Sequence, residues 1–257
     1  MLTGKHLQDS LHEAVETRRD VVVAIHQPNY IPWLGYFFKI AHADKFVFLD
    51  TVKFPTPGFV NRNSIKTRSG AEWLTIPVIR TGRSSQSIAE VETDRVQPWR
   101  RRHLMALRSN YGKAPHFKET FALLELHYKE RTGSANSLAG FNIGLIRAIA
   151  SYLMLSAQFV LASDLKNVSG QKTDLIRDIC LVVGGTSYLA GTGAKSYQED
   201  AKLEEVGITP LYSTFSSPTY LQRFGEFIPN LSIVDVLMNC GGFGTRKLLG
   251  IDSKAAK

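Results

Sequence analysis

The sequence has few cysteines and no long hydrophobic run. Only two of its 257 residues are cysteine, and Cys180 and Cys240 each sit inside an apolar run, far apart in the chain. Such residues are typical of a protein core and not of a disulfide framework, so we expect a reducing compartment. No stretch reaches the roughly 18 consecutive apolar residues of a membrane-spanning helix. The polar N-terminus also lacks the apolar region of a signal peptide, and the sequence therefore predicts a cytoplasmic protein without a membrane span.

The seven histidines show no ligand spacing, neither an HxxxH pair nor a Cys/His cluster, so we expect no metal site. No motif identifies a cofactor, and the oligomeric state stays open. Hydrophobic residues make up 44% of the chain and charged residues 21%, which argues for a folded domain with its own core. The net charge of +8 suits a polyanionic partner, either a phosphate-bearing small molecule or a nucleic acid.

Strand and helix patterns alternate along the chain. Residues 1–20 contain apolar side chains at helical spacing and are predicted to form a leader helix. An apolar β-branched run at 21–25 predicts a buried strand, 33–43 a helix and 46–49 a second strand. This order is typical of a βαβ unit with parallel strands.

Further strands are predicted at 73–79, 159–162, 187–190 and 209–213, whereas residues 51–72 are interpreted as a loop. Helices are expected near 98–110, 116–130, 136–151, 173–183, 199–206 and 232–239, the last closed by Gly241 and Gly242. We therefore predict an α/β fold with a mostly parallel, Rossmann-like sheet flanked by helices. Residues 21–257 would form a single domain that includes a helical lobe at about 98–151.

Polar side chains follow the first two predicted strands. Ligands of open parallel sheets bind at the carboxyl ends of the strands, and His26 and Asp50 leave neighbouring strands at that edge. They are the catalytic candidates, as a base and its orienting partner or as a base and a substrate anchor. Gln27, Asn29 and Tyr30 lie at the same strand end and would orient a substrate. Taken singly, the imidazole could be a loop cap and the carboxylate a strand-end cap.

The strand–loop–helix layout resembles nucleotidylyltransferases of the HIGH-motif class, in which this unit holds a nucleotide triphosphate. The segment PWLGY at 32–36 keeps only the glycine of that motif, and Trp33 and Tyr36 replace its histidines. We treat both aromatic residues as candidate substrate-binding residues.

Two further segments are candidates for phosphate binding. The predicted loop has no acidic residue after Asp50 until Glu72, and it contains four candidates, Asn61, Arg62, Asn63 and Lys66. Guanidinium and amide groups match the geometry of phosphate or carboxylate, although a solvated basic loop is the alternative. The glycine turn after the strand at 187–190 is followed by Lys195 and Tyr197, where a phosphate cradle and a tight strand–helix turn are equally possible.

Residues 95–118 contain seven basic side chains and no acidic one. The arginines that open the predicted helix oppose its dipole, a local conflict that is typical of functional surfaces. Aromatic residues interleave with them, so we predict a nucleic-acid-binding surface at Arg100, Arg101, Arg102 and Arg108, with a solvated helix face as the alternative.

Several strings taken together resemble the WbqC-like protein family. They are AIHQPNYIPWLGYF at 24–37, FLD at 48–50, NRN at 61–63, WLTIPV at 73–78, SYLAG at 187–191 and FIPNLSIVD at 227–235. The resemblance spans roughly residues 21–242 and excludes the leader and the 100–102 cluster. It implies an association with bacterial surface-polysaccharide gene clusters and glycine transferases. Amino-acid transfer onto modified thymine in phage DNA would be a chemically parallel role.

These observations lead to one functional hypothesis. We expect a transferase that joins an amino acid, with glycine as the leading candidate, to a phosphate-activated or nucleotide-linked acceptor. The acceptor is either a sugar of surface-polysaccharide biosynthesis or a modified pyrimidine in DNA. The alternatives are a non-catalytic nucleic-acid-binding protein and a nucleotidylyltransferase-like enzyme.

In this hypothesis His26 or Asp50 removes the proton of the attacking group, while Arg62, Lys66 and Lys195 hold the phosphate. It depends on one geometric expectation, namely that His26, Asp50 and Arg62 converge on a single pocket.

Overall fold

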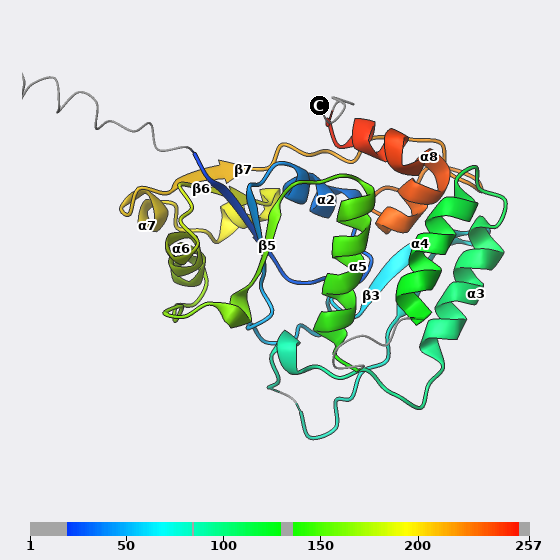
Figure 1. The fold of residues 1–257 in the computed structure, drawn as a ribbon, viewed down its shortest axis with the longest axis horizontal. Coiled ribbons are helices and arrows are strands. Elements are labelled where there is room, and N and C mark those ends of the chain that lie inside the picture. The colour runs from blue at the N-terminus through cyan, green and yellow to red at the C-terminus, as the bar shows by residue number, and fades with distance from the viewer. Residues whose placement is uncertain (1–19, 84, 130–135, 252–257) are drawn as a thin grey trace, which may run out of the picture.

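A computed structural model describes residues 20–83, 85–129 and 136–251, and the predicted leader helix lies outside these residues except for Asp20. Its centre is a five-stranded parallel sheet (Figure 1). The strand order is β5 (Gln158–Leu161), β2 (Lys45–Phe48), β1 (Val22–His26), β6 (Ser187–Ala190) and β7 (Thr209–Tyr212). The predicted α/β class with a parallel sheet is confirmed.

The central strands are apolar on both faces because helices cover both faces of the sheet. On one face, Val23, Ile25 and Val47 pack in a core with α6 (Thr173–Val182) and the short α7 (Ala201–Glu204). On the other face, Ala24 and Phe46 belong to a larger core with α2 (Leu34–Ala41) and α5 (Leu138–Tyr152). Figure 1 shows these two helix pairs on opposite sides of the strands. Such burial on both faces is typical of parallel sheets.

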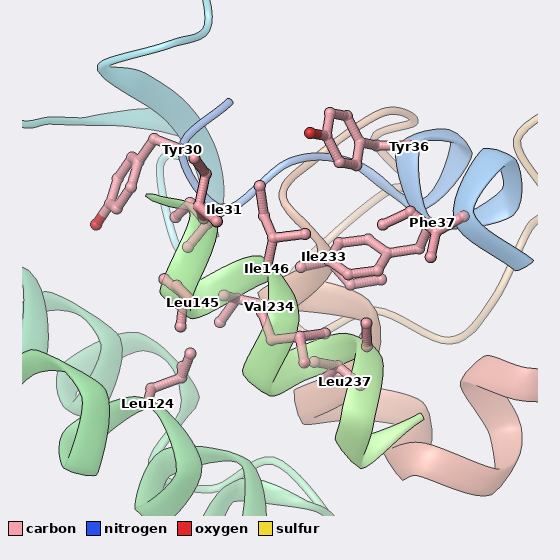
Figure 2. Close-up of a cluster of buried hydrophobic side chains, with 14 of the residues drawn as sticks. Tyr30, Ile31, Tyr36, Phe37, Leu124, Leu145, Ile146, Ile233, Val234 and Leu237 are labelled. Carbon is pink, nitrogen blue, oxygen red and sulfur yellow. The ribbon is translucent and has the colours of Figure 1, made fainter. Parts of the chain in front are cut away.

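The helical lobe continues the larger core instead of standing apart from it. Besides α5, it contains α3 (Trp99–Tyr111) and α4 (Phe117–Lys129), and α8 (Ile233–Leu248) packs beside them. Figure 2 shows Leu145 and Ile146 of α5 meeting Val234 and Leu237 of α8, with Phe37 of α2 beside them. One set of contacts therefore fixes α2, which follows β1, against the lobe.

Two predictions at the level of elements were wrong. The segment 51–72, interpreted as a loop, contains β3 (Arg62–Thr67), which pairs antiparallel with β4 (Gly70–Thr75) instead of leaving a lone strand at 73–79. The β3 sequence RNSIKT has no apolar run, because the strand buries polar groups against the rest of the chain.

The helix expected to close at Gly241 and Gly242 bends there and continues to Leu248. Gly241 has φ +66°, and a Cβ at this position would lie 2.5 Å from Nδ1 of His116. Glycine therefore permits a close approach here instead of ending the helix.

Three short 3₁₀ helices complete the described elements, η1 (Ile88–Glu90), η2 (Ala162–Asp164) and η3 (Thr192–Ser196). Within residues 20–83, 85–129 and 136–251, no helix is long and apolar enough to cross a membrane.

Candidate functional site

A large cavity opens where the strand order of the sheet changes direction. From β1 the chain moves outward to β2 and β5, and from there it returns to the other side of β1 through β6 and β7. The connections after β1 and β6 therefore diverge, and ligands of open α/β sheets bind in the crevice at such a point. A cavity of about 730 Å³ lies here, lined by residues from the ends of β1, β2, β6 and β7 and from the first turns of α2 and α6.

A buried lysine on α2 lines this cavity. Lys39 is 6% exposed, and its Nζ donates a hydrogen bond to the carbonyl oxygen of Ile25 at 3.0 Å. No carboxylate in the described part of the chain forms an ion pair with it. Burial lowers the pKa of the Lys39 ammonium from 10.5 to about 8. A buried charge with one neutral partner is costly, so an anion in the cavity would compensate it.

His26 ends β1 beside this ammonium and also lines the cavity. Its Nδ1 lies 3.1 Å from the carbonyl oxygen of Gln27, which can only accept, so Nδ1 carries the proton. The other ring nitrogen, Nε2, is then the basic atom. Burial, together with the charge of Lys39, lowers the pKa of His26 to about 3, and the free imidazole is neutral.

Two aromatic residues of the loop and of α2 hold the imidazole in place. The rings of Trp33 and Tyr36 lie 5.6 and 4.7 Å from that of His26, and the Tyr36 hydroxyl donates to the Gln27 carbonyl at 3.0 Å. Gly35 keeps this wall tight, because a Cβ there would lie 2.8 Å from Nε1 of Trp33. The orientation of His26 is therefore fixed by packing around it.

Helix starts add to the positive character of the cavity. Trp33 caps α2 and Lys172 caps α6, and neither supplies a side-chain hydrogen bond to the first turn. Both residues line the cavity, so both helix starts lie at its wall, but at α6 the N–H groups of Asp174 and Leu175 already bond to the carbonyl of Gln171. Uncapped N–H groups and the helix dipole favour negative charge.

The structure places four of the predicted site residues at this cavity, namely His26, Gln27, Trp33 and Tyr197. Tyr36 contacts His26 and Gln27 but does not itself line the cavity. Lys195 does not line the cavity and is exposed, with its Nζ 5.0 Å above the ring of Tyr212.

The expected convergence of His26, Asp50 and Arg62 on one pocket is not found. Asp50 is 2% exposed and accepts hydrogen bonds from the backbone N and the Oγ of Ser163, at 2.9 and 2.7 Å. Its carboxylate thus joins the end of β2 to the end of β5 and does not line the large cavity. Arg62 lies on the hairpin, where with Asn61 it lines a separate cavity of about 140 Å³.

Other candidates from the same segments are buried in the core. The Tyr30 hydroxyl bonds to Nδ1 of His103 at 2.7 Å and to the Tyr128 hydroxyl. The Asn63 amide donates to the carbonyls of Tyr30 and Ile31, at 3.3 and 2.9 Å. These groups hold the loop after β1 in shape, which the sequence alone does not separate from substrate binding.

Asn29, Asn61 and Lys66 are also buried. The Lys66 Nζ donates to Oε1 of Gln222 at 3.0 Å and to the carbonyl of Glu226, so it fastens the segment before α8. The Asn61 amide donates to the carbonyl of Ile76 at 3.0 Å.

The arginines of α3 do not form one free surface. Arg100 stacks on the rings of Trp99 and Phe141, at 4.7 and 4.6 Å, and donates to the Tyr128 carbonyl. Arg108 lies 3.7 Å from Glu125 and over the ring of Phe121. Arg101 and Arg102 are exposed.

Sequence reasoning missed Lys39 as a site residue, together with polar groups contributed by Thr173, Gln198 and Ser213. The signal for Lys39 was a single lysine in the apolar helix sequence LGYFFKIA, three residues after the buried Tyr36 and on its face. The other three residues come from distant segments, and only the folded chain brings them together.

Comparisons with known proteins agree with the resemblance found in the strings above. The model of the WbqC-like protein family matches residues 27–246. The chain is 37% identical over 220 residues to the uncharacterized protein Rv1507c of Mycobacterium tuberculosis, and this covers 85% of the chain and 94% of that protein. No solved structure matches the chain at a significant level. The chain belongs to the WbqC-like protein family.

Proposed function

We propose that the protein is a transferase that joins an amino acid to a phosphate-bearing acceptor, with the chemistry centred on His26 and Lys39. The observation that carries the proposal is the buried ammonium of Lys39, which lines a cavity of about 730 Å³ and has no carboxylate partner among the described residues. An anionic substrate group in the cavity supplies the missing counter-charge. Phosphate is favoured because the start of α2 adds N–H donors at the same wall and the start of α6 adds the positive end of its dipole.

The proposed step is a substitution at the acceptor. The amino nitrogen of the incoming amino acid forms a bond to the electrophilic carbon of the acceptor, and the bond from that carbon to the phosphate oxygen breaks. The phosphate leaves with the electron pair, and the proton of the amino group passes to Nε2 of His26. Lys39 and the helix N–H groups stabilise the charge on the leaving phosphate.

This arrangement also makes the base depend on the substrate. In the free protein, burial and the charge of Lys39 hold the pKa of His26 at about 3, where an imidazole is a weak base. A bound phosphate neutralises the ammonium and adds negative charge, and both effects raise the pKa of His26. The base therefore becomes effective only when the acceptor is in place.

Glycine as the amino acid follows from the resemblance to the family, and the small residues Gly191 and Gly193 at the cavity wall are compatible with a small group. For the acceptor we favour a nucleotide-linked sugar over a pyrimidine in DNA. Arg100 and Arg108 are engaged within the lobe, which leaves the exposed pair Arg101 and Arg102 as a small surface for a polymer.

The first experiment measures anion binding. Inorganic pyrophosphate is titrated into the protein by calorimetry, with Lys39→Met as the test variant and Lys45→Met as the matched control. Lys45 is also partly buried and bonded to a backbone carbonyl, that of Val183 at 2.5 Å, but it lies at the opposite end of the sheet. Binding lost in Lys39→Met and kept in Lys45→Met supports the proposal, and equal binding by both variants contradicts it.

The second experiment measures transfer. The protein is incubated with glycine and a nucleotide-linked sugar, and mass spectrometry detects the joined product. The proposal requires a product that disappears in His26→Gln. Release of pyrophosphate from a nucleoside triphosphate, with no joined product, would instead support a nucleotidylyltransferase-like enzyme.

A further inference from the structure

A row of aromatic rings leads away from the large cavity onto the hairpin. Trp33 lines the cavity, the ring of Phe59 lies 5.9 Å from that of Trp33, and the ring of Trp73 lies 5.9 Å from that of Phe59. Phe59 is 47% exposed and Trp73 51%. Two large aromatic side chains in contact and half-exposed are typical of a binding surface rather than of a core.

The row ends at a small cavity with two guanidinium groups. The guanidinium of Arg62 lies 4.6 Å above the ring of Trp73. Arg62 also lines the cavity of about 140 Å³, together with Arg80 and the threonines Thr56 and Thr75. Neither arginine forms an ion pair or a side-chain hydrogen bond with any residue that the structure describes. The two positive charges therefore have no negative partner in the part of the chain that the structure describes.

Guanidinium groups with threonine hydroxyls match the geometry and charge of a phosphate. The cavity volume is several times the roughly 30 Å³ that one water molecule occupies, so a phosphate group fits inside the cavity. Stacking on Trp73 also holds Arg62 in a fixed direction, which reduces the loss of side-chain freedom on binding. The neighbouring rings of Phe59 and Trp73 would contact a flat ring or the apolar face of a sugar.

We propose that the aromatic row and the two-arginine pocket form a second binding subsite for a phosphate attached to a sugar or nucleoside ring. The phosphate lies between Arg62 and Arg80, and the ring packs on Trp73 and Phe59. Only the role of the subsite rests on the proposed function. In that role, the subsite holds the far end of a substrate, and the reacting end of the same substrate reaches past Trp33 into the Lys39 cavity.

Tryptophan fluorescence tests the subsite. Glucose 1-phosphate and uridine 5′-monophosphate are titrated separately, which distinguishes a sugar phosphate from a nucleoside phosphate. Ring packing on Trp73 is expected to change the emission for at least one of them, and Trp73→Phe is expected to remove most of that change. Arg62→Ala and Arg80→Ala should each weaken binding about tenfold or more, while the exposed control Arg101→Ala should bind as the wild type does.

The Lys39→Met variant separates this subsite from the proposed function. Binding of the monophosphates that survives in Lys39→Met but falls in Arg80→Ala supports the subsite even if no transfer activity is found. Equal affinity of the wild type, Arg62→Ala and Arg80→Ala overturns the subsite, as does the absence of binding of both monophosphates at millimolar concentration. Arg80 is exposed and in a loop, so its replacement tests binding without endangering the fold.

Discussion

Replacing Lys39 with methionine separates what the residue costs the fold from what it contributes to binding. The ammonium is 6% exposed and has one hydrogen bond, to the carbonyl of Ile25 at 3.0 Å. Burial lowers its pKa from 10.5 to about 8. Because one pKa unit corresponds to about 1.4 kcal/mol, keeping this group charged costs the folded protein about 3 kcal/mol. Methionine has a similar length and no charge to bury.

Lys39→Met should therefore raise the free energy of unfolding at about pH 7, even though a native hydrogen bond disappears. Losing that bond costs about 1 kcal/mol, which leaves a net gain of about 2 kcal/mol and a melting temperature several degrees higher. The same variant should lose pyrophosphate binding. A variant that is more stable than the wild type but no longer binds the ligand indicates that the replaced residue is retained for function.

The pH dependence gives a second measure of the same charge. The unfolded chain takes up a proton on Lys39 near pH 10.5 and the folded protein only near pH 8, so between these values the unfolded state binds more protons. The stability of the wild type should then rise, relative to Lys39→Met, as the pH increases from 8 to 10.5. Urea unfolding at several pH values measures this. A variant that is less stable than the wild type at all pH values, or one that keeps pyrophosphate binding, would refute the reasoning.

Three further predictions concern other parts of the molecule. His26→Gln should lower the transfer rate by about a hundredfold or more while changing the melting temperature little at neutral pH, and an unchanged rate would remove His26 from the mechanism. As the pH falls below 6.5, this variant should lose stability less steeply than the wild type, because the imidazole of the folded wild type resists protonation until about pH 3. Asp50→Asn should lower the free energy of unfolding by about 2 kcal/mol in urea titrations, because the carboxylate accepts two hydrogen bonds from Ser163. The transfer rate at low temperature should stay nearly unchanged, and a loss of rate without a loss of stability would show that Asp50 belongs to the site. Leu145 is fully buried on α5 (Figure 2), and Leu145→Ala should lower the free energy of unfolding by about 2–5 kcal/mol in urea titrations. A loss below about 1 kcal/mol would contradict a single continuous core of sheet and lobe.

The strands of the parallel sheet could be predicted because their sequences carry the signal themselves. The runs around Val23 and Phe46 are apolar without alternation, as expected for strands buried on both faces. The hairpin strand Arg62–Thr67 carries no such signal, since its alternate side chains are polar and its burial depends on the segment before α8, about 160 residues later. Contacts at that separation leave no local pattern.

A cavity lies at the strand end where the sequence predicted a site, but only some of the predicted residues line it. The end of β1 was recognised because a parallel sheet dictates where ligands bind, and His26 and Trp33 do line the cavity. Asp50 occupies the expected strand end, yet its carboxylate is taken by a serine 113 residues further on. Lys39 was missed for the opposite reason, because an isolated lysine in an apolar helix usually extends its amine to solvent.

The basic residues of α3 show why charge counts alone do not define a surface. Arg100 lies among arginines in the sequence, but the fold stacks it between Trp99 and Phe141. Arg108 meets Glu125 of the neighbouring helix. The run of positive charge in the sequence predicted a polyanionic partner. In the fold, two of the four predicted arginines contact residues of the neighbouring helices instead.

The most direct test of the central claim is the pKa of the Lys39 side chain, measured by NMR of its labelled Cε with and without pyrophosphate. We predict a pKa of about 8 in the free protein. Bound pyrophosphate should raise this pKa, because the anion stabilises the ammonium, and Lys39→Met should identify the resonance. A Lys39 signal that titrates near 10.5 in the free protein, or one that pyrophosphate leaves unchanged, would contradict the assignment of this cavity as an anion site.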